Sequence, residues 1–269
     1  MTQQNDSPRR SLAAILGWTR SSYVILSIFL ATLVVIAVVW WPLMKAYIVY
    51  LDFSRPLWSQ VDWLLLGNFL LMTFLIMARP DLKADALIIM VGLAGGLAIE
   101  GWGTQTELWH YYTAERPPLW IIPAWPVAGL SFSRLARFLD HRVPEWNNRG
   151  FTVLYWIIFP AFYACLLIFV WPFADKSLTI LGLTACALMI ITPTDHRLAV
   201  VTFLAGTGLG FFLELWGTTR YCWTYYTEQQ PPFFAVLAHG MAAVAFWRAG
   251  LLARTVAGRL PKPFAKRAV

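Results

Sequence analysis

Charged residues are scarce in this chain of 269 residues, where Asp, Glu, Lys and Arg make up 13% and apolar residues make up 59%. A soluble globular domain carries about 25% charged residues. The mean hydropathy of the chain is +0.59. The composition therefore excludes an ordinary soluble protein and indicates an integral membrane protein.

Residues that carry metal and redox chemistry are also few. The three cysteines form no CxxC pair, and the four histidines are too few for the clusters that hold two irons. The sequence contains no GxxxxGK[ST] loop, no GxGxxG, no GxSxG elbow and no HExxH. We therefore expect no disulfide framework, no metal site, no ATP-driven reaction by this chain alone and no bound cofactor.

Long apolar runs fill most of the chain. A helix needs about 20 residues to cross about 30 Å of hydrocarbon, so the runs predict an all-α, polytopic membrane protein with about eight transmembrane helices. The first run is too long for a removable signal peptide. Pro123 and Pro126 are expected to kink the fourth helix. The eight runs cover residues 23–43, 61–78, 84–101, 118–138, 151–172, 177–193, 198–216 and 231–251.

Basic residues flank these runs on one side of the membrane if there are eight helices. They gather in the N-terminal tail, in the segments 79–85, 134–150 and 195–197, and in the tail 254–267. Short cytoplasmic loops are enriched in Lys and Arg, which predicts a bacterial inner-membrane protein with both termini in the cytoplasm. Topology and anionic lipid headgroups then account for the net charge of +7, and we expect no nucleic-acid partner.

One stretch of sequence occurs twice. The first copy, EGWGTQTELWHYYTAERPP, begins at Glu100, and the second copy, ELWGTTRYCWTYYTEQQPP, begins at Glu214. The copies are identical at 10 of 19 positions at an offset of 114, and the match extends outward to Asp81 and Asp195. Self-similarity at a fixed offset predicts a duplication.

The duplication divides the predicted helices into two repeats of four. We expect a first repeat at 23–140, a linker at 141–150 and a second repeat at 151–254, between cytoplasmic tails at 1–22 and 255–269. An even number of helices in each repeat makes the two repeats parallel, about an axis along the membrane normal. Both motif copies then lie on the outer face.

A glutamate stands at the end of an apolar run in each copy. Gly96 and Gly210 precede Glu100 and Glu214 by one helical turn, where a missing side chain lets another helix or a flat ligand approach the carboxylate. An acid within a span marks a functional site by default. The alternative is that both glutamates only brace the neighbouring loops through hydrogen bonds to Thr or Tyr.

The residues after each glutamate predict a helix end near the membrane surface. Gly103 and Gly217 suit the left-handed residue at a helix C-terminus, and the Pro-Pro pair is expected to begin the next helix. The aromatic segment between them is expected to lie along the headgroup zone. Aromatic residues anchor many membrane proteins there, so anchoring is the alternative to a binding role for Trp109, Trp223 and most of the tyrosines.

The copies differ at one informative position, where residue 125 is Trp and residue 239 is His. His239 is predicted to lie in the eighth helix at a depth similar to Glu214, a pair suited to proton transfer near neutral pH. A hydrogen-bonded packing histidine is the alternative. Asn68 in the second helix is a further polar candidate, with a helix–helix hydrogen bond as the alternative.

The spacing GxxxExxGTxT from Gly96 to Thr106, followed by HYYT and a proline, resembles the signature of the membrane-bound carotenoid hydratases, the gamma-carotene and bisanhydrobacterioruberin hydratase group. The resemblance implies a multi-helix protein that adds water across the terminal double bond of an acyclic isoprenoid without a redox cofactor. It implies that Glu100 and Glu214 are the acidic residues. The pocket residues that it implies are Tyr111, Tyr112, Tyr225 and Tyr226.

Two functions remain open. The first is a membrane-embedded acid–base enzyme on an isoprenoid or other lipid, with Glu100, Glu214 and His239 as catalytic residues. A carboxyl group in an apolar wall stays protonated and can protonate an alkene, and aromatic faces can stabilise the carbocation. The second is a non-catalytic protein that binds a lipid, quinone or carotenoid, acts in transport, or stabilises a membrane complex or homo-oligomer. The predicted binding residues are Trp102, Trp216, Trp109, Trp223, Tyr111, Tyr112, Tyr225, Tyr226, Thr104, Thr218 and Asn68.

Overall fold

The computed structural model describes residues 12–49, 51–143 and 148–259, so the predicted tails and the predicted linker lie partly outside the described residues. The chain forms two compact units, Met1–Ala86 and Leu87–Val269. Among the described residues, five helices are long and apolar enough to cross a membrane, which makes this a mainly α-helical integral membrane protein. They are Arg20–Val39, Leu82–Gln105, Arg149–Phe173, His196–Thr219 and Phe233–Val256.

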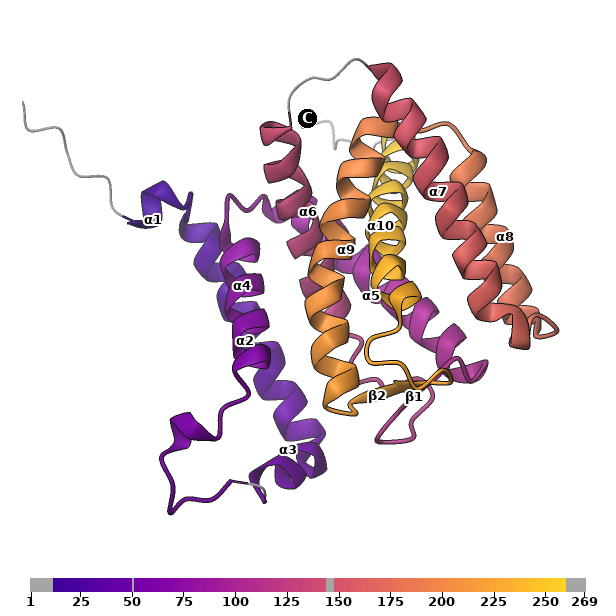
Figure 1. Ribbon diagram of the computed structural model, residues 1–269. Helices are drawn as coiled ribbons and strands as arrows, with labels where there is room; N and C mark the ends of the chain where they lie inside the picture. The colour runs from indigo at the N-terminus through magenta and orange to yellow at the C-terminus, as the bar shows by residue number, and fades with distance from the viewer. Residues whose placement is uncertain (1–11, 50, 144–147, 260–269) are drawn as a thin grey trace, which may run out of the picture. The chain divides into compact units, whose positions relative to one another are not determined.

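The first unit is built around helices α2 (Arg20–Val39) and α4 (Trp63–Met77), which pack against each other (Figure 1). The rings of Phe29 and Phe69 stack between them with centroids 5.3 Å apart. The hydroxyl of Ser22 donates a 2.7 Å hydrogen bond to the carbonyl of Met77. Shorter helices complete this unit, namely α1 (Leu12–Ile15), α3 (Trp41–Ile48) and the 3₁₀ turn η1 (Leu57–Ser59).

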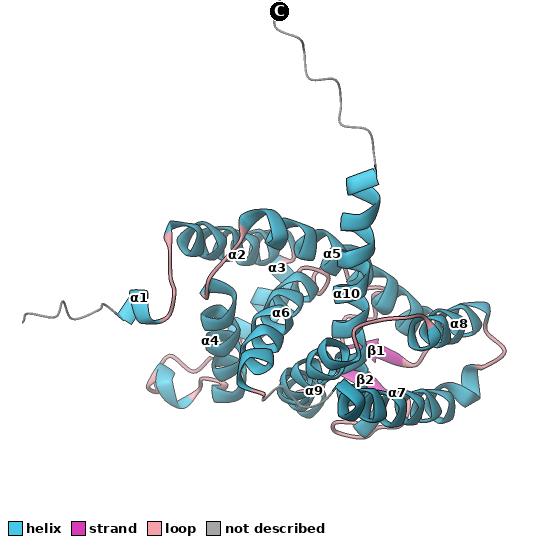
Figure 2. Cartoon of the chain, turned by 90° about the horizontal axis from the view of Figure 1, so that it is seen from above, coloured by secondary structure: helices cyan, strands magenta, loops and turns pink. Residues whose placement is uncertain are grey.

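The second unit contains the remainder of α5 (Leu82–Gln105) and all later elements. Helix α9 (His196–Thr219) packs against α6 (Ala124–Arg142), α7 (Asn148–Val170) and α10 (Phe233–Arg259) (Figure 2). Helix α8 (Ser177–Ile191) follows α7 through the 3₁₀ turn η2 (Trp171–Phe173) and packs along it. Helices α9 and α10 approach closely because Gly206 leaves room for the backbone of His239.

A helix lies at each of the eight positions that the apolar runs predicted, but several differ in extent. Helices α4 and α8 have 15 residues each, and the first run is divided at Trp40 into α2 and α3. The fourth run, 118–138, begins with turns, because α6 starts only at Ala124. The predicted kink is therefore wrong: Pro123 is the N-cap of α6 and Pro126 stands in its first turn, where the missing N–H has no helical partner to lose.

The aromatic segments of the two motif copies form a small sheet. Strands β1 (Trp109–Tyr111) and β2 (Trp223–Tyr225) pair antiparallel, with His110 opposite Thr224. Residues 110 and 224 are themselves 114 apart, so the pairing is symmetric about this position. Trp109 and Trp223 are both buried within the protein, each 9% exposed.

The helix ends of the two copies have the same local geometry, although not the one predicted. Gly103 and Gly217 are no left-handed C-caps, since α5 and α9 continue to Gln105 and Thr219. The left-handed residues come later, at Glu107 with φ of 66° and at Tyr221 with φ of 54°. The backbone N–H of Leu108 donates to Gly103 over 2.9 Å, and that of Cys222 donates to Gly217 over 2.8 Å.

Candidate functional site

Glu100 lies near the C-terminal end of α5 and is 4% exposed. Its Oε1 accepts a hydrogen bond from the indole Nε1 of Trp125, and its Oε2 accepts one from Trp109, both over 3.0 Å. Trp109 belongs to β1 and Trp125 to the first turn of α6. A buried carboxylate needs such donors because it has lost its water, so Glu100 ties three segments of the second unit together.

Glu214 occupies the equivalent position in α9 and is 3% exposed. Its Oε2 accepts a 3.0 Å hydrogen bond from the indole of Trp223. Its Oε1 accepts a 2.9 Å bond from the hydroxyl of Tyr225 and lies 2.9 Å from Nε2 of His239. The carboxylate therefore joins α9 to β2 and α10, as Glu100 joins α5 to β1 and α6.

Glycines create the space for the rings that bond the glutamates. At four positions, a Cβ atom in place of the glycine hydrogen would collide with such a ring. Only glycine fits at these positions, because a ring packs directly against the backbone. The prediction that Gly96 and Gly210 allow a neighbouring helix to approach is confirmed. The four contacts are Gly103 with Trp109, Gly217 with Trp223, Gly96 with Trp125 and Gly210 with His239.

The strand pair brings side chains of the first motif copy into contact with side chains of the second. The ring of Trp109 packs against Tyr225 at 5.7 Å between centroids, and that of Tyr111 packs against Trp223 at 5.9 Å. Trp109, which bonds Glu100, thus contacts a tyrosine of the second copy. Trp223, which bonds Glu214, likewise contacts a tyrosine of the first copy. The two halves enclose one polar cluster, which we call the glutamate cluster: Glu100, Glu214, Trp109, Tyr111, Trp125, Trp223, Tyr225 and His239.

Electrostatics also couple the two halves. Burial, and then the charge of Glu100, raise the pKa of Tyr111 well above its ordinary value, and the charge of Glu214 adds to this. Burial and the charge of Glu214 raise the pKa of Tyr225 in the same way. Both hydroxyls therefore keep their protons and act as hydrogen-bond donors to the carboxylates.

One position breaks the symmetry of the glutamate cluster. Trp125 and His239 stand at equivalent places, and their rings stack with centroids 5.8 Å apart and planes 20° apart. An indole N–H can only donate, whereas an imidazole can accept a proton at one nitrogen and release one from the other. Nδ1 of His239 is buried and has no hydrogen-bond partner among the described residues. The second half alone therefore contains an imidazole, one nitrogen of which lacks a hydrogen-bond partner among the described residues.

Six of the other residues predicted for substrate binding lie around the cluster. Thr104 and Thr218 donate to the backbone carbonyls of Glu100 and Glu214 over 2.6 Å. Asn68 is buried in α4 of the first unit. Four predicted aromatic residues stand at the edge: Trp102 and Trp216 meet Trp109 and Trp223 edge-on, Tyr112 is exposed, and Tyr226 donates to the carbonyl of Phe169.

Sequence reasoning misses the part played by Trp125. In the sequence it stands out only as the residue that replaces histidine in the first copy, and not as a partner of Glu100. The offset of 114 between Trp125 and His239 is the available signal, because equivalent positions of a duplication face equivalent neighbours. Cys222, which precedes β2, is buried, and burial raises its thiol pKa to about 12.

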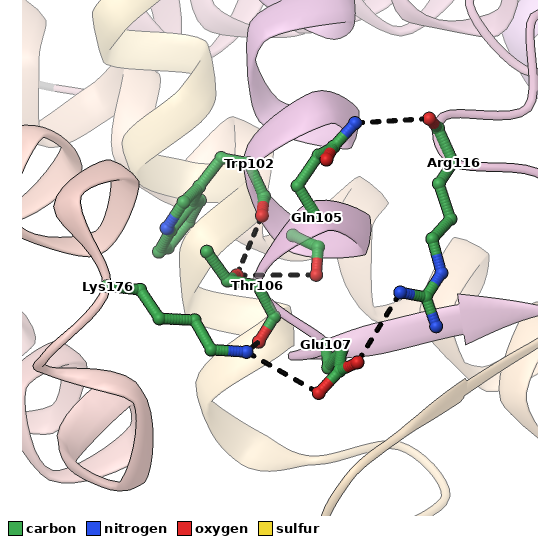
Figure 3. A network of polar contacts seen from close by, with 7 residues as sticks. Trp102, Gln105, Thr106, Glu107, Arg116 and Lys176 are labelled. Atoms are coloured by element: carbon green, nitrogen blue, oxygen red, sulfur yellow. Dashed lines mark hydrogen bonds and ion pairs between the residues drawn. The ribbon is translucent and has the colours of Figure 1, made fainter.

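A second polar network fixes the C-terminal end of α5 (Figure 3). Nζ of Lys176 donates to the carbonyl of Thr106 over 2.9 Å and lies 3.4 Å from Oε2 of Glu107. Nη1 of Arg116 lies 3.4 Å from Oε1 of the same glutamate. Gln105 donates to the carbonyl of Arg116 over 3.3 Å. The network ties the end of α5 to the turn before α8 and to the loop after β1.

Replacement of Glu107 by Gln is expected to lower thermal stability in detergent at neutral pH, and the deficit is expected to vanish in acid. The charges of Lys176 and then Arg116 lower the pKa of Glu107 from its ordinary 4.5. A lowered pKa contributes stability above the unfolded-state pKa, and that contribution is lost as the pH falls through the folded-state pKa. Melting curves over a pH series measure it. A constant deficit at every pH would contradict the ion-pair origin, and Glu115→Gln in the same loop is the control.

The described residues contain no group of three or more His, Cys, Asp or Glu side chains that could hold a metal ion. The partners of Glu100 are the indoles of Trp109 and Trp125 and the hydroxyl of Tyr111, which act as hydrogen-bond donors. Comparison of the chain with known protein families, curated proteins and solved structures finds no match.

Proposed function

We propose that this protein is a membrane-embedded acid–base enzyme, hydratase-like, which acts on an isoprenoid or another lipid with an electron-rich double bond. The observation that carries the proposal is the 2.9 Å contact between Nε2 of His239 and Oε1 of Glu214 in a buried setting. A carboxylate beside an imidazole orients the ring and stabilises its protonated form. Glu214 and His239 are thus the groups that hold and move the proton.

In this proposal, the unpaired Nδ1 of His239 is the atom that donates the proton to the substrate. Both oxygens of each glutamate accept hydrogen bonds within the cluster, whereas Nδ1 of His239 does not. The imidazolium gives its Nδ1 proton to one alkene carbon and becomes neutral, while the other carbon becomes cationic. Water adds its oxygen to the cationic carbon, and the surplus proton returns to Nδ1. The sum is alkene plus water to alcohol, and no oxidant or cofactor is consumed.

Aromatic faces near His239 suit a cationic intermediate. Trp125 stacks on the imidazole, and Phe132 meets it edge-on with centroids 6.4 Å apart. Aromatic rings attract cations through their quadrupoles. The same rings give His239 apolar surroundings, which suit a hydrocarbon substrate better than a polar one.

The membrane arrangement that we propose has eight spans in two parallel four-helix repeats, with both termini in the cytoplasm of a bacterial cell. It is supported by a helix at each of the eight predicted positions and by the equivalent geometry of the two motif copies. The glutamate cluster then lies near the outer face of the membrane.

A second candidate function is non-catalytic. Glu100 accepts hydrogen bonds from two indoles, and neither can supply or accept a proton in exchange. This half of the cluster is a structural brace, and two such braces would suit a protein that binds a lipid, quinone or carotenoid, or that assembles with itself or another membrane protein. In that case both glutamates would contribute to stability alone.

Catalysis and bracing differ in the effects of Glu214→Gln and Glu100→Gln. Each variant is purified in mild detergent, supplied with an acyclic carotenoid in water labelled with oxygen-18, and extracted for mass spectrometry. The wild type is expected to produce an alcohol that carries the label. Glu214→Gln is expected to lose this activity by about 10²-fold or more, and Glu100→Gln is expected to lose much less. If the wild type yields no labelled alcohol and both variants lose the same thermal stability, the enzyme hypothesis is wrong. That result would support a structural role for both glutamates.

A further inference from the structure

Trp125 contacts both halves of the glutamate cluster. Its Nε1 donates a 3.0 Å hydrogen bond to Oε1 of Glu100, and its ring stacks on that of His239. His239 in turn bonds Glu214. A continuous line of contacts therefore runs from the carboxylate of the first copy, through an indole, to the imidazole and the carboxylate of the second.

An indole can pass the influence of Glu100 on to His239, for two physical reasons. A stacked aromatic face attracts a cation by its quadrupole. A carboxylate that accepts the indole N–H bond polarises the ring, and such polarisation is stronger in a low-dielectric interior. The charge of Glu100 therefore strengthens the attraction between the face of Trp125 and a protonated His239.

We infer that Trp125 is a positioning residue through which Glu100 stabilises the imidazolium form of His239. This assigns a role to the first half of the cluster, which contains no proton-exchanging ring of its own. The inference rests on the proposed acid–base role of His239. It concerns the protonation of the ring, which is observable without any substrate.

The test is nuclear magnetic resonance of the full chain in detergent, with ¹⁵N-labelled histidine and His239→Gln for assignment. Trp125→Phe keeps a ring over His239 but removes the N–H bond to Glu100. At a fixed pH it is expected to lower the ratio of imidazolium to imidazole at His239 by about two- to fivefold. The matched control is Trp109→Phe, which also removes a 3.0 Å indole bond from Glu100 but whose ring packs on Tyr225 and Trp102.

Glu100→Gln provides a second route to the same result. It is expected to shift His239 in the same direction as Trp125→Phe, and the double variant is expected to shift it no further than the larger single change. An unchanged His239 in Trp125→Phe, or an equal shift in Trp109→Phe, would overturn the inference. If Trp125→Phe does not fold, the response of His239 to Glu100→Gln decides. If the protonation of His239 responds to Trp125 and Glu100 as expected but the protein hydrates no alkene, the inference stands and only the proposed function is wrong.

Discussion

His239→Gln is expected to lower the rate of alkene hydration by about 10²- to 10⁴-fold while the protein remains folded. The glutamine amide reaches to about the position of Nε2 and can still donate to Glu214, but it cannot take up and release a proton. Oxygen-18 incorporation into the alcohol measures the rate. Thermal unfolding in the same detergent shows whether the fold is intact.

His196→Gln is the matched control for this experiment. His196 stands at the start of α9, where its ring stacks on Tyr155 at 4.3 Å and its Nδ1 lies 3.1 Å from the hydroxyl of Thr152. It has no part in the glutamate cluster, so hydration is expected to continue unchanged. Hydration that persists in His239→Gln at the wild-type rate would exclude His239 as the proton donor.

Gly217→Ala is expected to destabilise the protein strongly, although it adds only one methyl group. The added Cβ would occupy the place of the Trp223 ring. Overpacking of this kind costs about 1–3 kcal/mol, and displacement of the indole also removes the hydrogen bond to buried Glu214, at a cost of about 1.5–3 kcal/mol. The thermal unfolding midpoint in detergent is expected to fall by many degrees.

Gly208→Ala in the same helix is the matched control. No atom lies within 4 Å of the position that its Cβ would take. Alanine also favours a helix over glycine, so the midpoint is expected to stay the same or to rise slightly. Equal unfolding midpoints for Gly217→Ala and the wild type would contradict this prediction, because they would show that the Trp223 ring can move aside without loss of stability.

The membrane class and the positions of the helices could be predicted from the sequence. Twenty consecutive apolar residues have few alternatives to a spanning helix, because backbone N–H and C=O groups in lipid must be satisfied within the segment. The limits of α6 could not be predicted in the same way. The Pro residues at 123 and 126 are compatible with a kink or with a helix start, and the chain adopts the start.

The repeat indicated that the two glutamates belong to a site, but the C-cap role predicted for the glycines that follow them is wrong. Gly103 and Gly217 resemble C-caps in sequence, since glycine after an apolar helix usually adopts the left-handed conformation. The structure uses them within the helix, where each accommodates a tryptophan ring. A glycine that allows a turn and a glycine that allows a close approach are identical in a sequence and differ only in their neighbours.

The sequence by itself determined that this is a membrane protein of many helices, that one motif occurs twice, and that each copy contains an acid within an apolar run. Only the tertiary structure decided which groups bond those acids. Trp125 and His239 reach Glu100 and Glu214 from the next helices of their own copies, while β1 and β2 bring Trp109 and Tyr225 together across the two copies. Helical and strand periodicity describe which face of a segment is apolar. The pairing of segments far apart in the chain depends on how all of them pack at once, and no local pattern contains it.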